Sequence, residues 1–138
     1  MYELEVCVDR IEDAVVAERA GATRIEFNQA LSLSGLTPSP SSCRWLKSRL
    51  PIPLVAMVRP HDDGFVYSSQ TQGIMLDECD DLLAQGVDGI VVGALNENRE
   101  LDIAFLKRVR NRVGSLELIM HRAFDEVDCQ RTALEQLI

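Results

Sequence analysis

The chain has 138 residues, 46% of them hydrophobic and 26% charged, which is the composition of one folded domain or of part of a larger one. Acidic residues outnumber basic ones by 22 to 14, and the net charge of −8 argues against binding to nucleic acid or to an anionic membrane surface. No apolar run approaches the ~20 residues that span a bilayer, and Glu3 and Glu5 stand where a secretory leader would carry positive charge. We therefore expect a cytoplasmic protein.

Short runs of β-branched residues alternate with longer helical patterns, and the first strand is predicted at residues 4–8. Asp9 is the predicted N-cap of a helix that runs through Ala20 and ends at Gly21. A second strand is predicted at residues 24–27.

A loop over residues 34–40 leads into a helix predicted at 41–50, which Pro51 ends because its ring cannot continue the hydrogen-bond ladder. The third strand is predicted at 52–58, and a helix at 71–85 follows it. The apolar side chains expected on the buried side of this helix are Ile74, Met75, Leu82 and Leu83.

The fourth predicted strand, residues 87–92, is continuously apolar, which is typical of a parallel strand covered on both faces. Asp102 opens the next predicted helix and Gly114 ends it. The remaining predicted elements are a strand at 116–120, its exit loop at 121–127 and a helix from about Cys129.

Repeated strand–helix units predict an α/β fold with parallel strands and right-handed crossovers. An open doubly wound sheet would carry a glycine-rich turn after the first strand, and Val8-Asp9-Arg10 has no glycine. We therefore expect a TIM (β/α)8-barrel type of fold, in which polar residues gather at the C-terminal ends of the strands. A complete barrel needs about 250 residues, so residues 1–138 are expected to form its N-terminal portion, roughly the first four and a half βα units.

Alternation along a strand places its polar side chains on one face, which we expect to point into the barrel. Charged residues inside strands are costly unless they are paired or functional, so Glu5 and Glu26 indicate either a structural Arg–Glu pair or a ligand contact. The side chains expected to converge on one cavity are Glu5, Cys7, Glu26, Asn28, Met57 and Arg59.

The densest polar group beside a strand end is the segment 121–126. His121 could transfer protons near neutral pH with Asp125 as its orienting partner, or it could simply pack. Arg59 and Arg122 could form a fork for carboxylate or phosphate. The candidate catalytic residues are therefore His121, Glu26 and Asp125, and the candidate substrate-binding residues are Glu5, Arg59 and Arg122.

Two other features admit both a metal-binding and a structural interpretation. The segment His61-Asp62-Asp63-Gly64 offers metal ligands, but adjacent aspartates before a glycine are also common in turns. The four cysteines lack a C-x-x-C pair, so we expect reduced thiols, several of them packing as small hydrophobic side chains.

Seven motifs, in order along the chain, resemble those of the CutC family of copper-homeostasis-type proteins. They are Leu4-Glu5-Val6-Cys7-Val8-Asp9, Gly21-Ala22-Thr23-Arg24-Ile25-Glu26, Gly35-Leu36-Thr37-Pro38-Ser39, Arg59-Pro60, Phe65-Val66-Tyr67-Ser68, Gly93-Ala94-Leu95 and His121-Arg122-Ala123-Phe124-Asp125. The resemblance implies a TIM barrel, a cytoplasmic location, a tendency to form homo-oligomers, and Cu(I) binding through cysteines at the ends of the first two strands.

On this resemblance, the first copper-binding cysteine corresponds to Cys7, and the second position is occupied by Asn28. Cu(I) prefers soft thiolate and thioether donors, so Asn28 is a poor ligand and Met57 is the alternative donor. Three functions remain open. They are a cytoplasmic copper-homeostasis protein that binds Cu(I) through Cys7, a barrel enzyme acting on a small anionic or sugar-like metabolite, and a structural fragment that needs a partner chain.

Overall fold

A computed structural model describes residues 2–138 and contains a single parallel sheet of five strands. The strands are β1 (Glu5–Val8), β2 (Arg24–Phe27), β3 (Leu54–Met57), β4 (Gly89–Val92) and β5 (Glu117–Met120). The α-helices are α1 (Ile11–Arg19), α2 (Pro40–Lys47), α3 (Ser69–Leu83), α4 (Ile103–Val113) and α5 (Gln130–Leu137), with 3-10 turns at Leu31–Leu33 and Arg122–Glu126.

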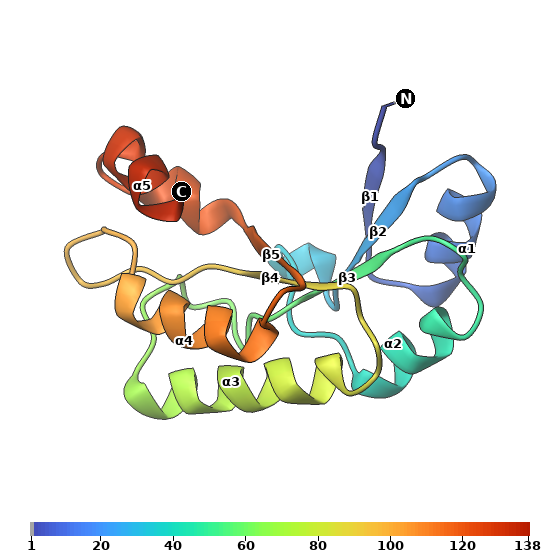
Figure 1. Cartoon of the computed structure of the whole chain (residues 1–138), viewed down its shortest axis with the longest axis horizontal. Coiled ribbons are helices and arrows are strands. Elements are labelled where there is room, and N and C mark those ends of the chain that lie inside the picture. The colour runs from blue at the N-terminus through green and yellow to red at the C-terminus, as the bar shows by residue number, and fades with distance from the viewer. Residues whose placement is uncertain (1) are drawn as a thin grey trace.

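The strands follow one another across the sheet in chain order, β1-β2-β3-β4-β5. With right-handed crossovers this order places every connecting helix on the same side of the sheet, and Figure 1 shows α1 to α4 gathered there. A doubly wound sheet would reverse its strand order and carry helices on both faces. The order therefore confirms the predicted α/β fold of barrel type, with β1 and β5 as the edges of the described sheet.

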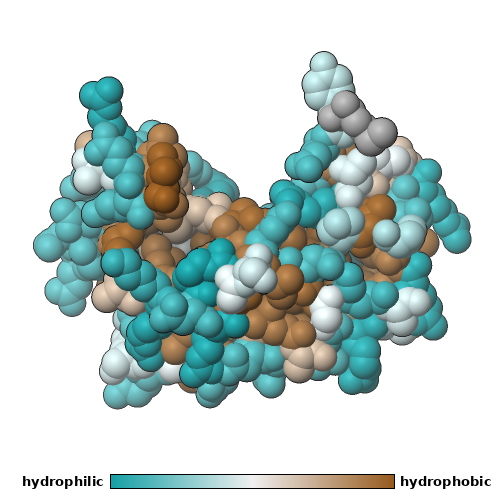
Figure 2. Space-filling view, viewed as in Figure 1, coloured by the Kyte–Doolittle hydropathy of each residue, from teal (hydrophilic) through white to brown (hydrophobic). Residues whose placement is uncertain are grey.

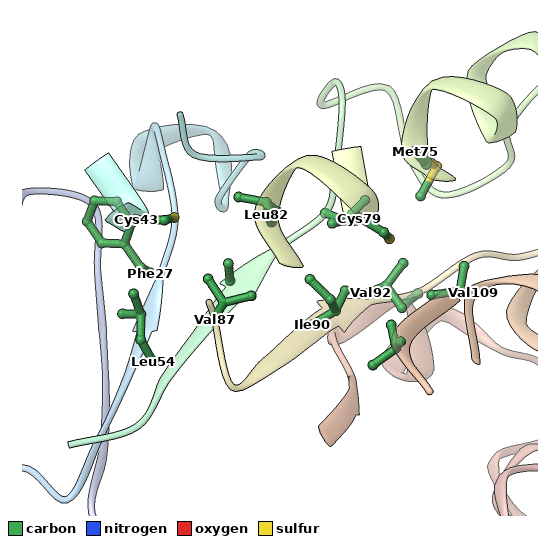
Figure 3. Close-up of a cluster of buried hydrophobic side chains, with 14 of the residues drawn as sticks. Phe27, Cys43, Leu54, Met75, Cys79, Leu82, Val87, Ile90, Val92 and Val109 are labelled. Atoms are coloured by element: carbon green, nitrogen blue, oxygen red, sulfur yellow. The ribbon is translucent and has the colours of Figure 1, made fainter. Parts of the chain in front are cut away.

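The main hydrophobic core lies between the sheet and this helical layer. Ile90 and Val92 of β4 face Cys79 and Leu82 of α3 there, whereas Leu54 of β3 lies beside Phe27 and Cys43, as Figure 3 shows. Every residue of β3 and β4 is buried, because helices cover one face and neighbouring side chains fill the other. The buried Cys43 and Cys79 pack as small hydrophobic side chains, as expected.

The structure corrects three local expectations. Asp9 does not cap α1: the N-cap is Arg10, without a side-chain bond, and the Asp9 carboxylate instead accepts a hydrogen bond from the backbone N–H of Leu31 at 2.9 Å. The second helix ends at Lys47 rather than at Pro51. Ile74 is 55% exposed, and the buried side of α3 is formed by Met75, Leu76, Cys79 and Leu82.

Two predicted helix starts agree with the structure. Asp102 caps α4 by accepting a hydrogen bond from the backbone N–H of Phe105 at 3.0 Å, and the last helix begins directly after Cys129. Within residues 2–138, the helices are all too short or too polar to cross a bilayer.

Candidate functional site

The face of the sheet opposite the helices is hollow and forms a pocket of about 1000 Å³. Figure 2 shows this hollow as a notch between two raised ends of the molecule, one formed by α5 and the other by β1 and β2. All seven residues that the sequence nominated line the pocket: Glu5, Cys7, Glu26, Arg59, His121, Arg122 and Asp125. The predicted convergence of these side chains is therefore observed, although their chemical roles stay predictions.

The strand register arranges the inward side chains in layers. Cys7 is opposite Glu26, and Glu26 is opposite Val55, so these residues form a lower layer. Met57, Val91 and Ile119 pack together one step higher as a small apolar cluster. The uppermost inward residues on the last three strands are Arg59, Gly93 and His121, two residues beyond that cluster on each strand.

The floor of the pocket carries an ion-pair network. Arg24 Nε donates to Glu5 Oε2 at 2.5 Å, and its Nη1 donates to Glu117 Oε2, also at 2.5 Å. Of the two sequence-based interpretations of Glu5, the structure thus supplies the structural Arg–Glu pair. Glu5 lines the pocket and is paired with Arg24, whose single positive charge it shares with Glu117.

A second cluster joins Cys7, Glu26 and Asn28 at the ends of β1 and β2. Glu26 Oε1 accepts from the Cys7 thiol at 3.3 Å and from Asn28 Nδ2 at 3.0 Å, and Asn28 Nδ2 also lies 3.1 Å from Cys7 Sγ. Partial burial, with the charge and hydrogen bond of Glu26, raises the pKa of the Cys7 thiol from 9.0 to about 12. Cys7 is therefore a protonated hydrogen-bond donor at neutral pH.

This cluster offers a Cu(I) ion a single thiol donor. Cu(I) binds the thiolate, so it would have to displace the proton of Cys7, whose pKa is raised to about 12 in the metal-free protein. The position expected to supply a second thiol holds Asn28, whose amide is already engaged with Glu26 and Cys7. Residues 2–138 contain no group of three or more His, Cys, Asp or Glu side chains placed to hold a metal ion.

Arg59, at the upper end of β3, is the most deeply buried charge in the pocket, with 5% of its surface exposed. Its Nη1 donates to the backbone carbonyls of Leu33 at 2.8 Å and Gly35 at 3.1 Å, while its Nε is buried without a hydrogen-bond partner. Within the described chain it forms no salt bridge. The nearby Tyr67 is neutral, since burial raises the pKa of its hydroxyl to about 12 despite the charge of Arg59.

His121 lies directly beyond β5 and is held in a neutral state. Burial, with the nearby charge of Arg59, lowers its pKa from 6.5 to about 4. Its Nδ1 accepts a hydrogen bond from the backbone N–H of Ala123 at 3.1 Å, which leaves the ring proton on Nε2. Nε2 is itself buried and without a partner, so the imidazole presents one unused N–H donor.

The orienting partner expected for His121 is therefore replaced by a backbone group. Asp125 pairs with Arg122, with Oδ2 of the aspartate 3.5 Å from Nε of the arginine. The hydrogen bond to the His121 ring comes from the backbone N–H of Ala123 and not from Asp125. Arg122 and Asp125 are exposed at the rim of the pocket. Arg122 does not join Arg59 in a preformed fork, because Arg59 is buried against the carbonyls of the 31–35 segment instead.

Two residues complete the upper layer that sequence reasoning did not nominate. The centroid of the Phe65 ring lies 4.9 Å from the centroid of the His121 ring and 5.2 Å from Cζ of Arg59. Phe65 therefore contacts both side chains. Gly93 provides the space that the His121 ring fills, because a Cβ there would lie 2.5 Å from His121 Cε1. A glycine ending an apolar strand is a known indication of such a close approach.

The segment 61–64 forms a turn rather than a ligand set. The backbone N–H of Asp63 donates to His61 Nδ1 at 3.3 Å, and Gly64 adopts a φ of 69°. Asp62 and Gly64 line the outer part of the pocket. This supports the turn interpretation of these residues.

Comparison with known proteins gives a consistent result over the whole chain. The model of the CutC family matches residues 2–138. A family protein CutC from Treponema denticola is 38% identical over 136 residues, and copper homeostasis protein cutC homologs from Drosophila melanogaster and Homo sapiens are 41% and 40% identical over 127 and 139 residues. The chain spans about half the length of these relatives, between 48% and 55%.

Solved structures give the same picture of the fold. A CutC structure from Streptococcus agalactiae superposes with a TM-score of 0.92 at 25% identity, covering 99% of this chain and 68% of that one. A structure named as a deoxyribose-phosphate aldolase, from Toxoplasma gondii, superposes with a TM-score of 0.63 at 17% identity, covering 97% and 55%. The second likeness concerns the fold alone.

Proposed function

Because the chain belongs to the CutC family, we propose that its pocket at the carboxyl ends of the strands binds a small anionic organic molecule. Active sites of barrel enzymes occupy this end of the fold. The observation that carries the proposal is Arg59, a buried guanidinium without an acidic partner anywhere in residues 2–138. A buried charge is costly unless it is paired, and an anionic ligand would supply the missing partner.

The surroundings of Arg59 support a carboxylate or phosphate as that partner. A guanidinium binds either group through directed N–H donors, and Nη1 is the single guanidinium nitrogen of Arg59 that hydrogen-bonds within residues 2–138. The neutral His121, whose ring proton is on Nε2, also lines the pocket. The net charge of −8 would repel anions at a distance, so the attraction has to be local, as a buried arginine provides.

If the bound molecule is also transformed, Glu26 is the proposed proton acceptor and His121 the proposed hydrogen-bond donor. Glu26 is a carboxylate without a cationic partner in the described part of the chain, and its Oε2 accepts no hydrogen bond there. With a pKa of about 4, His121 would act at neutral pH as a neutral N–H that polarises a carbonyl rather than as an imidazolium acid. Asp125 and Arg122 would contact ligand only at the rim.

The proposal is tested by calorimetric titration of the protein with sodium hexanoate and with inorganic phosphate. Binding of at least one probe should be lost or greatly weakened in Arg59→Gln and kept in Arg10→Gln, which removes an exposed arginine at the start of α1. Arg59→Lys should bind the probe more tightly than Arg59→Gln but less tightly than the wild type, because lysine restores the positive charge without the paired N–H donors of a guanidinium. Equal binding by the Arg59→Gln and wild-type proteins would overturn the proposal.

Cu(I) binding is the second candidate, favoured by the names of the Drosophila and human relatives and by a cysteine on the pocket wall. Its donors would be the Cys7 thiolate and the Met57 thioether, both of which line the pocket. The test is competition for Cu(I) with a chromogenic chelator. Loss of copper uptake in Cys7→Ser would support copper as the ligand, whereas equal uptake by the variant and the wild type would remove Cys7 from the site.

A further inference from the structure

The two walls of the pocket differ in the polar atoms they leave unused. Arg59 Nε and His121 Nε2, on the wall formed by β3 and β5, are buried donors without partners. Glu26 Oε2, on the wall formed by β1 and β2, is an acceptor without a partner, since both hydrogen bonds to this carboxylate go to Oε1. The residues that carry these atoms, Arg59, His121 and Glu26, all line the same cavity, and only Nη1 of the Arg59 guanidinium hydrogen-bonds within residues 2–138.

Neither set is neutralised by the other or by the rest of the described chain. The nearest inward cation to Glu26 along its own strand is Arg24, which is committed to Glu5 and Glu117. Arg59 forms no salt bridge, so Glu26 does not serve as its partner. The Arg59 guanidinium and the Glu26 carboxylate could both be paired by one ligand that binds in the cavity.

The two sets are separated along the strands by an apolar layer. Glu26 is opposite Val55, and Arg59 follows Val55 by four residues, a rise of about 13 Å along an extended strand. Met57 lies between them on the inward face, packed with Val91 and Ile119. Both residues line the cavity.

We infer that the ligand is bipolar: a carboxylate at Arg59 and His121, a short chain across Met57, and a hydroxyl or ammonium donor at Glu26 Oε2. This inference rests on the proposed function and adds the class of ligand, an ω-hydroxy or ω-amino acid or a sugar acid of about six carbons. A ligand with only the anionic end would leave Glu26 desolvated and without a partner, which costs free energy.

The inference is tested with four six-carbon probes that differ only at their ends: hexanoate, 6-hydroxyhexanoate, 6-aminohexanoate and 1,6-hexanediol. Dissociation constants are measured by calorimetry or by NMR titration of the wild-type protein. We expect at least one of the two bipolar probes to bind on the order of 10-fold tighter than hexanoate, as one good hydrogen bond to a charged group allows. The stronger of the two identifies the donor as hydroxyl or ammonium.

Two variants separate the ends of the site. In Glu26→Gln the preference for the bipolar probe over hexanoate should fall to near unity, while hexanoate itself still binds. In Arg59→Gln the binding of all three carboxylate probes, hexanoate, 6-hydroxyhexanoate and 6-aminohexanoate, should weaken. Glu12→Gln, which removes an exposed carboxylate of α1, is the matched control and should leave every constant unchanged, and circular dichroism of each variant establishes that it is folded.

The failures of the two proposals give different results. Equal binding of hexanoate and both bipolar probes, all weakened by Arg59→Gln, would overturn the bipolar ligand and keep the anion site. Binding of 1,6-hexanediol as tight as that of 6-hydroxyhexanoate would overturn the anion site. If the wild-type protein binds none of the four probes in the millimolar range, both proposals are wrong.

Discussion

The imidazole of His121 occupies the space that a side chain at Gly93 would need. A Cβ built on Gly93 would lie 2.5 Å from His121 Cε1, 2.6 Å from Nδ1 and 2.8 Å from the Cβ of Ala123. The same Ala123 supplies the backbone N–H that bonds Nδ1. The ring is thereby fixed from both sides, which leaves Nε2 as its only available polar atom.

Gly93→Ala should displace the His121 ring and destabilise the protein. We expect a loss of about 1–3 kcal/mol in the free energy of unfolding, the usual cost of overpacking a buried position, together with weaker binding of the carboxylate probes. Urea denaturation measures the first effect and calorimetry the second. The matched control is Gly73→Ala in α3, where a Cβ meets nothing within 4 Å; it should stabilise the protein by about 0.5–1 kcal/mol. A neutral effect of Gly93→Ala would contradict the packing described here.

His121 should make stability depend on pH. Its pKa falls from 6.5 to about 4 in the folded state, so between these values the unfolded chain binds the additional proton. The stabilisation from the neutral ring is then complete above about pH 6.5 and decreases as the pH falls toward 4. Wild-type protein should therefore lose about 2 kcal/mol between pH 7 and pH 5 that His121→Gln does not lose.

Two measurements check this dependence. Urea denaturation at pH 7 and pH 5 gives the difference between wild type and His121→Gln, with His61 present in both proteins. An NMR titration of the two imidazoles, assigned with the same variant, gives the pKa directly. If the His121 resonance titrates with a midpoint close to 6.5, the buried neutral ring is ruled out.

Cys7 should react slowly with iodoacetamide although its side chain reaches the surface. The thiolate is the nucleophile, and the pKa of Cys7 is raised to about 12, whereas hydrogen bonding by Thr132 lowers the pKa of the exposed Cys129. Peptide mapping by mass spectrometry at pH 8 should find Cys129 alkylated first and the buried Cys43 and Cys79 protected. Glu26→Gln should accelerate alkylation of Cys7 several-fold, and equal rates for Cys7 and Cys129 in the wild type would refute the hydrogen-bonded thiol.

The unpaired edges of β1 and β5 predict self-association. Each edge strand pairs with a single neighbour in the described structure, and exposed parallel edges are sites of intermolecular pairing. Sedimentation velocity should show a weight-average mass that rises with concentration in the micromolar range. Leu116→Lys, which adds charge at the exposed position just before β5, should reduce this association, whereas Val16→Lys on α1 should not. A monomer at all concentrations would exclude the edges as contacts.

The architecture was predictable because it depends on local periodicity. Alternation of strands and helices, with a buried run at residues 87–92, is sufficient to predict parallel β strands, and the missing glycine-rich turn after β1 favours the barrel type. The gathering of Glu26, Arg59 and His121 in one pocket followed from the same alternation, since it decides which side chains share a face.

The partners of the polar side chains were not predictable, because they depend on how the loops between the elements fold. Asp9 looked like a helix cap until its bond to Leu31, 22 residues later, was visible. Asp125 looked like the orienting partner of His121, but the backbone of Ala123 reaches Nδ1 first. The uncompensated charge of Arg59 likewise emerges only when all neighbouring strands are in place.

The floor network described above also spans the curved sheet. In a flat sheet β2 and β5 would be about 14 Å apart, three strand spacings, yet a single arginine on β2 reaches a glutamate on β5 at 2.5 Å. Arg24 thus links the lower ends of β2 and β5 across the concave face of the sheet. Arg24→Met removes this link, so the variant should hold β2 and β5 together only through the backbone ladders of the two strands between them.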